Sequence, residues 1–138
     1  MTRGLAVDPG EKRLGLALSD ETGAIAFPLR IFEHVSRMLD AALVLQIAGE
    51  TGAEYIVIGQ AIDSDGSLGS QARRAGKFAE AVKSLTNLPV ILWDESGSTQ
   101  AARAVRIEMK VSRRKRKGPI DDIAATIILQ SYLDARVD

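Results

Sequence analysis

Four carboxylates stand where the chain could do chemistry, and they are Asp8, Asp94, Glu95 and Asp121. The sequence has no Cys and only one His, so a soft metal ion would find few ligands. Carboxylate oxygens instead favour a hard cation, Mg²⁺ or Mn²⁺, which keeps several waters and suits phosphate substrates. Two such ions can activate a water and stabilise the leaving oxygen in phosphodiester hydrolysis. The residue types therefore favour a metal-dependent hydrolase.

Each of these acids also has a purely structural interpretation. Asp8 precedes Pro9-Gly10 and could begin a turn, and Glu95 could be a solvated loop residue. Asp121 lies in the first turn of an expected helix, where the helix macrodipole favours a negative charge. Their joint placement favours a shared site, because ligands of open α/β sheets bind beyond the carboxyl ends of parallel strands.

A basic stretch lies between Gly97 and Gly118. It holds eight Lys or Arg residues and one acidic residue, although the whole chain has a formal net charge of +0. Its consecutive cations are Arg113, Arg114, Lys115, Arg116 and Lys117. A cationic strip beside an acidic site would hold nucleic-acid phosphates without reading sequence, and the alternative is a solvated charged segment. Arg13 is a further candidate phosphate contact.

Three other features carry weaker signals. The polar loop Asp65–Ser70 could cradle a phosphate through backbone N–H groups, but it lacks the ending of a Walker loop, and a connector is the simpler interpretation. His34 has no His or Cys neighbour in the sequence and is expected at the surface or in a loop. Tyr55, Phe78 and Trp93 are expected in the core, because aromatic residues at 4% are too few to stack bases.

Length and composition indicate one globular domain, residues 1–138. Hydrophobic residues at 46% and charged residues at 26% are ordinary values, and a chain of this length buries a core without disulfides. No apolar run approaches the ~18 residues of a membrane span, and no signal-peptide pattern opens the chain. Together with the missing Cys, this favours a cytoplasmic protein with no membrane partner.

The hydrophobic pattern predicts the elements that must position the acids. Strands are expected at 3–8, 13–19, 24–32, 55–59 and 89–93. Helices are expected after an N-cap at Ser36, at 71–85, at 99–110 and from Gly118-Pro119 onward. The first three strands are joined by tight turns as an antiparallel meander, and the later strands alternate with helices. This order predicts an α/β fold with a partly parallel sheet.

Four blocks of sequence together resemble the YqgF family. They are L-A-V-D-P-G-E-K-R-L-G-L-A-L-S-D from Leu5, I-V-I-G-Q-A-I-D-S-D-G-S from Ile56, P-V-I-L-W-D-E-S from Pro89, and I-D-D-I-A-A-T-I-I-L-Q-S-Y-L-D from Ile120. Members of this family are ribonuclease H-like proteins associated with Holliday-junction resolution and with pre-16S rRNA processing. The resemblance implies a five-stranded mixed sheet, with three antiparallel strands followed by two parallel ones, flanked by helices.

The resemblance also implies a site and an activity. Asp8, Glu95 and Asp121 match the family's acidic triad, as catalytic residues and as ligands of Mg²⁺ or Mn²⁺. The implied activity is a divalent-metal-dependent endonuclease that matures the 5′ end of pre-16S rRNA. Two segments depart from the family pattern, which usually reads Arg-Leu-Thr-Thr at 96–99 and Leu-Pro-Leu-Asn at 60–63. Both lie at the expected active edge and bear on rate and substrate preference more than on the fold.

Other functions stay open on the sequence. A Holliday-junction resolvase would use the same site on branched DNA, and its two symmetric cuts favour a homodimer, whereas a monomer favours RNA processing. A nucleic-acid-binding or ribosome-assembly module would keep the fold without cleavage. An actin-like nucleotide-binding fragment, suggested by Asp8-Pro9-Gly10 and Gly15, would need a second domain. The expected partners are therefore precursor rRNA or branched DNA, and the ribosomal subunit.

Overall fold

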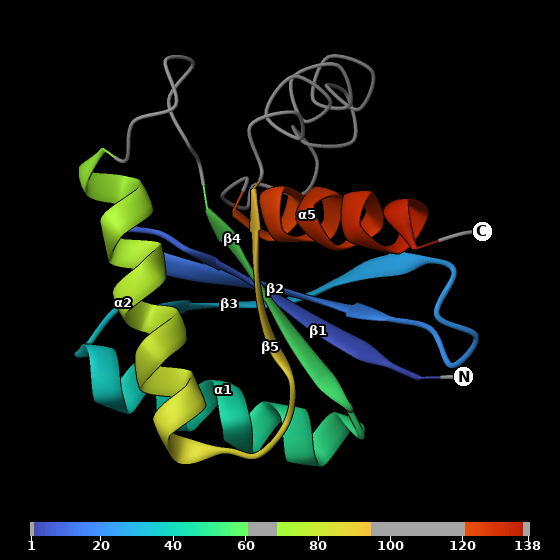
Figure 1. Cartoon of the computed structure of the whole chain (residues 1–138), viewed down its shortest axis with the longest axis horizontal. Coiled ribbons are helices and arrows are strands. Elements are labelled where there is room, and N and C mark those ends of the chain that lie inside the picture. The colour runs from blue at the N-terminus through green and yellow to red at the C-terminus, as the bar shows by residue number, and fades with distance from the viewer. Residues whose placement is uncertain (1, 61–68, 95–120, 137–138) are drawn as a thin grey trace.

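The computed structural model describes residues 2–60, 69–94 and 121–136. Its strands are β1 (Gly4–Pro9), β2 (Arg13–Ser19), β3 (Ala26–Glu33), β4 (Tyr55–Gln60) and β5 (Val90–Asp94). Its helices are α1 (Arg37–Thr51), α2 (Ser70–Leu85) and α5 (Asp121–Ala135), and Figure 1 shows how they surround the sheet. The helix expected at 99–110 and the basic stretch fall outside the described residues.

All five strands belong to one sheet with the order β3-β2-β1-β4-β5. β1 pairs antiparallel with β2, and β2 pairs antiparallel with β3. On the other side, β1 pairs parallel with β4, and β4 pairs parallel with β5. The predicted mixed sheet is confirmed. Pro28 lies in the edge strand β3, where a missing N–H costs no ladder hydrogen bond on the open side.

The two faces of the sheet pack against different helices. Leu5, Val7 and Leu16 project with α1 and α2 into one core, which also receives Ile56 and Ile58. The alternate residues of the same strands project into a second core with α5, and they are Ala6, Ala17, Ala26, Tyr55 and Val57. This alternation is the pleat of buried strands, and it gives every residue of β1, β2 and β4 a defined face.

The turn between β2 and β3 is organised by one aspartate. Asp20 Oδ1 accepts hydrogen bonds from the N–H groups of Ala24 (3.0 Å) and Ile25 (3.1 Å). Its other oxygen accepts from Thr22 Oγ1 at 2.7 Å, and these bonds lower the pKa of the Asp20 carboxyl. Because Asp20 binds the N–H groups of residues 24 and 25, the strand begins at Ala26, two residues later than the pattern predicts.

Helix α1 has a cap at each end. Ser36 Oγ accepts from the N–H of Leu39 at 3.2 Å, which confirms the predicted N-cap. Gly52 closes the helix with a φ of 76°, a left-handed conformation that favours glycine. The buried side of α1 carries one charged residue, Asp40, among Ala41, Val44, Ile47 and Ala48.

Within the described residues no helix is long and apolar enough to cross a membrane.

An aromatic cluster joins the end of α5 to the start of β4. Tyr132 lies 5.7 Å from Tyr55 and 5.2 Å from Trp93 between ring centroids, and the Arg136 guanidinium lies 5.1 Å from the Tyr55 ring. Tyr55 and Phe78 are buried, as predicted, whereas Trp93 is only half-buried. Burial raises the pKa of the Tyr55 hydroxyl, and the positive charge of Arg136 opposes this shift.

Candidate active site

The parallel strands bring their carboxyl ends to one edge of the sheet. Val7 of β1 is level with Ile58 of β4, which is level with Leu92 of β5. β2 runs antiparallel to β1, so its amino end reaches the same edge, with Asp8 opposite Gly15. This carboxyl edge is where α/β sheets place ligands, and it holds the first of the predicted acids.

Asp8 lies one residue before the end of β1 and is half-buried. Ala6, two residues earlier on the same strand, projects into the core under α5, so Asp8 lies on the α5 face of the sheet. The turn that follows is tight, since the Gly10 N–H donates to the Asp8 carbonyl at 3.0 Å. A Cβ on Gly10 would stand 2.3 Å from the Arg13 carbonyl oxygen, so this close approach requires glycine.

Helix α5 covers that same face and begins at Asp121. Arg136 at the far end of the helix stacks on Tyr55, and Tyr55 is level with Gly4 at the amino end of β1. The helix has 15 residues and extends for about 22 Å, so its first turn lies toward the opposite, carboxyl edge. Figure 1 shows this course, with the end of α5 on the same side of the molecule as the start of β1.

Asp94 is the last residue of β5, but it lies on the other face. Trp93 packs against the core under α5, and its Nε1 donates to Ser131 of α5 at 3.3 Å. Asp94, the next residue in the strand, alternates toward the side of α2, as Gln60 does beside it. Gln60 Nε2 donates to the Ala72 carbonyl of α2 at 3.0 Å. Strand pleating therefore separates Asp8 from Asp94.

Other predicted site residues are described only in part. Glu95 and the cations Arg113, Arg114, Lys115, Arg116 and Lys117 lie outside the described residues, and Asp121 is described only as the start of α5. Within the described residues no three acidic or His side chains are grouped so as to hold a metal ion. Arg13, the first residue of β2, is exposed at the carboxyl edge.

A pocket of ≈ 340 Å³ opens on the side of α1 and α2, at the Pro9-Gly10 turn that follows Asp8. Among the described residues it is lined by Pro9, Gly10, Leu14, His34, Arg37, Asp40, Arg74 and Phe78. His34 Nδ1 lies 2.5 Å from Asp40 Oδ2, and the Val35 N–H donates to Asp40 Oδ1 at 3.1 Å. The sequence placed His34 at the surface, which its side-chain exposure of 44% confirms, but it did not indicate the partner. The contact could not be found from the sequence, because Asp40 is buried by the packing of α1 and no local sequence pattern pairs it with His34.

The sequence of the chain matches one family model along almost its whole length. Residues 2–135 match the model described as RuvX, Holliday junction resolvase. Proteins named as pre-16S rRNA nucleases are its relatives: one from Geobacillus kaustophilus is 41% identical over 136 residues, which cover 97% of this chain and 99% of the relative. Another from Symbiobacterium thermophilum is 42% identical over 130 residues, which cover 94% and 90% of the two chains.

Solved structures with the same fold include two Holliday-junction enzymes. Thermus thermophilus RuvC in complex with a Holliday junction superposes with a TM-score of 0.65 at 18% identity, covering 99% of this chain and 96% of RuvC. The fowlpox virus Holliday junction resolvase gives a TM-score of 0.59 at 15% identity, covering 98% and 99%. These likenesses show the ribonuclease H-like fold alone. Because the family match covers residues 2–135, and the relatives are about two-fifths identical along nearly their whole length, the chain belongs to the RuvX (YqgF) family.

Proposed function

We propose that the protein is a divalent-metal-dependent endonuclease that cleaves structured nucleic acid, with the 5′ end of pre-16S rRNA as its substrate. The observation that carries this proposal is the position of Asp8, on the carboxyl edge and on the face that α5 covers from Asp121 onward. Relatives of similar length that are named as pre-16S rRNA nucleases support the choice of substrate.

The donor chemistry fits a hard cation. Asp8, Glu95 and Asp121 would supply only carboxylate oxygens, which Mg²⁺ and Mn²⁺ prefer, and the chain contains no Cys to attract a softer metal. When bound, one or two such ions lower the pKa of a water and stabilise charge on the departing oxygen. Half-burial of Asp8 at a strand end keeps its carboxylate oriented without a long, mobile stem.

Cations around the carboxyl edge would hold the substrate. Arg13 is exposed at the start of β2, and the proposal adds the five consecutive cations Arg113, Arg114, Lys115, Arg116 and Lys117. Contacts of this kind go to phosphates, so they position the strand without selecting its sequence. Substrate choice would then rest on the shape of the folded RNA.

The substitution Asp8→Asn tests the proposal, because it removes one charged ligand while changing no volume. We expect cleavage of a precursor 16S rRNA fragment in Mn²⁺ to fall by about 1,000-fold, equivalent to ~4 kcal/mol of transition-state stabilisation. Asp94→Asn is the matched control, an acid of the same edge on the opposite face, and its loss should be far smaller. Equal cleavage by Asp8→Asn and wild-type protein would refute the assignment of the site.

Junction resolution is a second candidate. The family model is described as a Holliday junction resolvase, and this fold is shared with solved structures of such enzymes. A resolvase makes two symmetric cuts, which favours a homodimer, whereas a monomer favours RNA processing. Cleavage of a four-way DNA junction in preference to precursor rRNA would select this candidate. A binder without metal-dependent cleavage on either substrate would instead be an assembly factor, acting with the ribosomal subunit.

The described strands share one sheet with helices on both faces, which supports a single domain for residues 1–138. We propose that this domain acts in the cytoplasm.

A further inference from the structure

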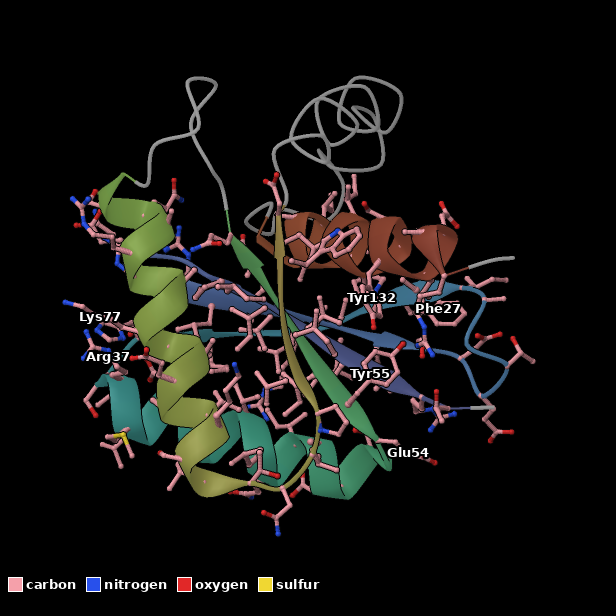
Figure 2. The ribbon with its side chains drawn as sticks, viewed as in Figure 1. Phe27, Arg37, Glu54, Tyr55, Lys77 and Tyr132 are labelled. Carbon is pink, nitrogen blue, oxygen red and sulfur yellow. The ribbon has the colours of Figure 1, made fainter. Side chains whose placement is uncertain are left out.

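The pocket at the Pro9-Gly10 turn, on the α1 and α2 face, is lined by two arginines. Arg37 is the first residue of α1 and is exposed, whereas Arg74 belongs to the first turns of α2 and is half-buried. Figure 2 shows Arg37 on the flank of the molecule where α1 begins, the flank on which Lys77 of α2 also lies. Two guanidinium groups from different helices repel each other unless an anion lies between them.

Neither arginine has its charge satisfied within the part of the chain that the structure describes. No hydrogen bond or ion pair joins Arg37 or Arg74 to another described residue. Partial burial of a guanidinium without an anionic partner is costly, and among the described residues the half-buried Arg74 has no such partner. A bound anion would supply the missing partner.

Asp40, the one carboxylate among the described residues that line the pocket, already has partners. Asp40 is 3% exposed, and its two oxygens contact the Val35 N–H and His34 Nδ1. The His34 N–H of the backbone donates to the Lys12 carbonyl at 2.9 Å, which ties the segment before α1 to the turn after β1. Asp40 therefore fixes the segment before α1 and, among the described residues, does not pair with either arginine.

The place of the pocket indicates which anion it would receive. Pro9 and Gly10, which line it, directly follow Asp8, and two residues of extended chain span at most about 7 Å. Leu14 and Phe78 form an apolar wall of the pocket. Its volume of ≈ 340 Å³ lies within the ~300–1,000 Å³ range of ligand pockets. The pocket opens on the α1 and α2 face, whereas Asp8 lies on the α5 face, and the Pro9-Gly10 turn at the carboxyl edge separates the two. A nucleic-acid strand that presents one phosphodiester to Asp8 and crosses the edge over this turn would bring a neighbouring phosphate to the pocket.

We propose that this pocket is a phosphate subsite in which Arg37 and Arg74 together grip one backbone phosphate of the substrate strand, next to the phosphodiester that is cut. The inference rests on the proposed nuclease function and adds a positioning contact to it. A planar guanidinium fork suits a phosphate, because it donates two parallel hydrogen bonds. Holding a neighbouring phosphate fixes the register of the strand over the carboxyl edge.

Binding measurements test the subsite separately from cleavage. The probe is a fluorescently labelled RNA hairpin with a single-stranded 5′ extension, titrated in a series of KCl concentrations with the Asp8→Asn protein. Arg37→Gln and Arg74→Gln should each weaken binding about tenfold, which corresponds to the loss of one charge-assisted contact. The double substitution should lose less than the product, because both arginines hold the same phosphate. It should also lower the salt slope by ~0.7–0.9.

Two further variants keep the outcome specific. Lys83→Gln removes a cation from the same helix about 13 Å farther along its axis and should leave affinity and salt slope unchanged. Arg74→Lys keeps the charge but not the fork, so it should retain the salt slope while weakening binding. Unchanged affinity in the folded double variant, or an equal loss in Lys83→Gln, would overturn the subsite.

A free anion is the competing source of the same chemistry. Inorganic phosphate is therefore titrated into the wild-type and Arg74→Gln proteins, with binding followed by NMR shifts of the arginine side chains. One contrary outcome is that the wild-type protein binds inorganic phosphate saturably while Arg37→Gln and Arg74→Gln leave the affinity for the hairpin unchanged. This result would assign the pocket to a free anion and overturn the proposal. If the protein cleaves RNA but the arginine substitutions change neither binding nor cleavage, the subsite is wrong and the nuclease function stands. If the substitutions weaken binding but the wild-type protein cleaves nothing, the nuclease function is wrong and the binding subsite stands.

Discussion

In strands β1 and β2, the two faces of the sheet differ in the size of the side chains that they present. Toward α1 and α2 the strands project large residues such as Leu5, Leu16 and Ile58. Toward α5, β1 and β2 project the small residues Ala6 and Ala17, whereas β4 projects the larger Tyr55 and Val57. The helix contributes Ala125 together with the larger Ile128, Leu129 and Leu133. Large side chains bury more apolar area and carry more of the stability, since each buried Leu or Ile contributes ~1.5–3 kcal/mol.

Small side chains serve a different purpose on the α5 face. Alanines on both the sheet and the helix allow the two backbones to approach closely, and close packing leaves little freedom in the position of the helix. α5 begins at Asp121, on the face where β1 presents Asp8. The comparison teaches that one face mainly stabilises the fold, while the other holds a helix in register with the proposed acidic site.

The adjacent residues Leu16 and Ala17 of β2 point to opposite faces and give a matched pair of tests. Leu16→Ala should have the largest effect on stability, a loss of about 2–5 kcal/mol, because Leu16 is fully buried and its removal leaves a cavity. Urea denaturation measures this loss. The folded variant should cleave at nearly the wild-type rate, and a large loss of rate would show that the α1 and α2 face also controls the site.

Ala17→Leu should cost less stability but more activity. Overpacking a buried alanine costs about 1–3 kcal/mol, and here the added atoms would press on α5. Displacement of the helix should lower the cleavage rate of the folded protein more than Leu16→Ala does. The rate per folded molecule, measured at saturating substrate, decides the point, and equal rates in the two variants would contradict the assignment of roles.

The smallest expected effect on stability concerns the hydroxyl of Tyr55, which lies at the start of β4 on the α5 face. Burial raises the pKa of Tyr55 in the folded protein above its unfolded value of about 10. Its contribution to stability is therefore complete below about pH 10 and is lost as the pH rises through the folded value. Tyr55→Phe should therefore reduce the fall in the free energy of unfolding at alkaline pH, as measured by urea denaturation across the alkaline range. An identical alkaline profile in both proteins would rule out this contribution.

Much of the fold was predictable because its signals are local. Apolar runs bounded by turn residues predicted all five strands, and the Ser36 N-cap predicted the start of α1. The start of β3 was predicted two residues early. The hydrogen bonds of Asp20 reach beyond the turn to Ala24 and Ile25, and no count of apolar residues contains that information.

The candidate site was predictable only in part. A strand that stops at Pro9-Gly10 indicated where Asp8 would lie, and β1 ends there as expected. The sequence alone could not separate Asp94 from Asp8, because the two faces are assigned by the register of β4 and β5. The contacts of Asp40 with His34 and Val35 were also missed, since they depend on how α1 packs.

The sequence by itself determined the order of strands and helices and the placement of an acid at the end of β1, because short-range periodicity and turn chemistry act within a few residues. Only the tertiary structure decided that Asp8 shares a face with α5, and that Arg37 and Arg74 line one pocket at the Pro9-Gly10 turn. Those relations join segments that are distant in the chain, and the packing of helices on a pleated sheet sets them.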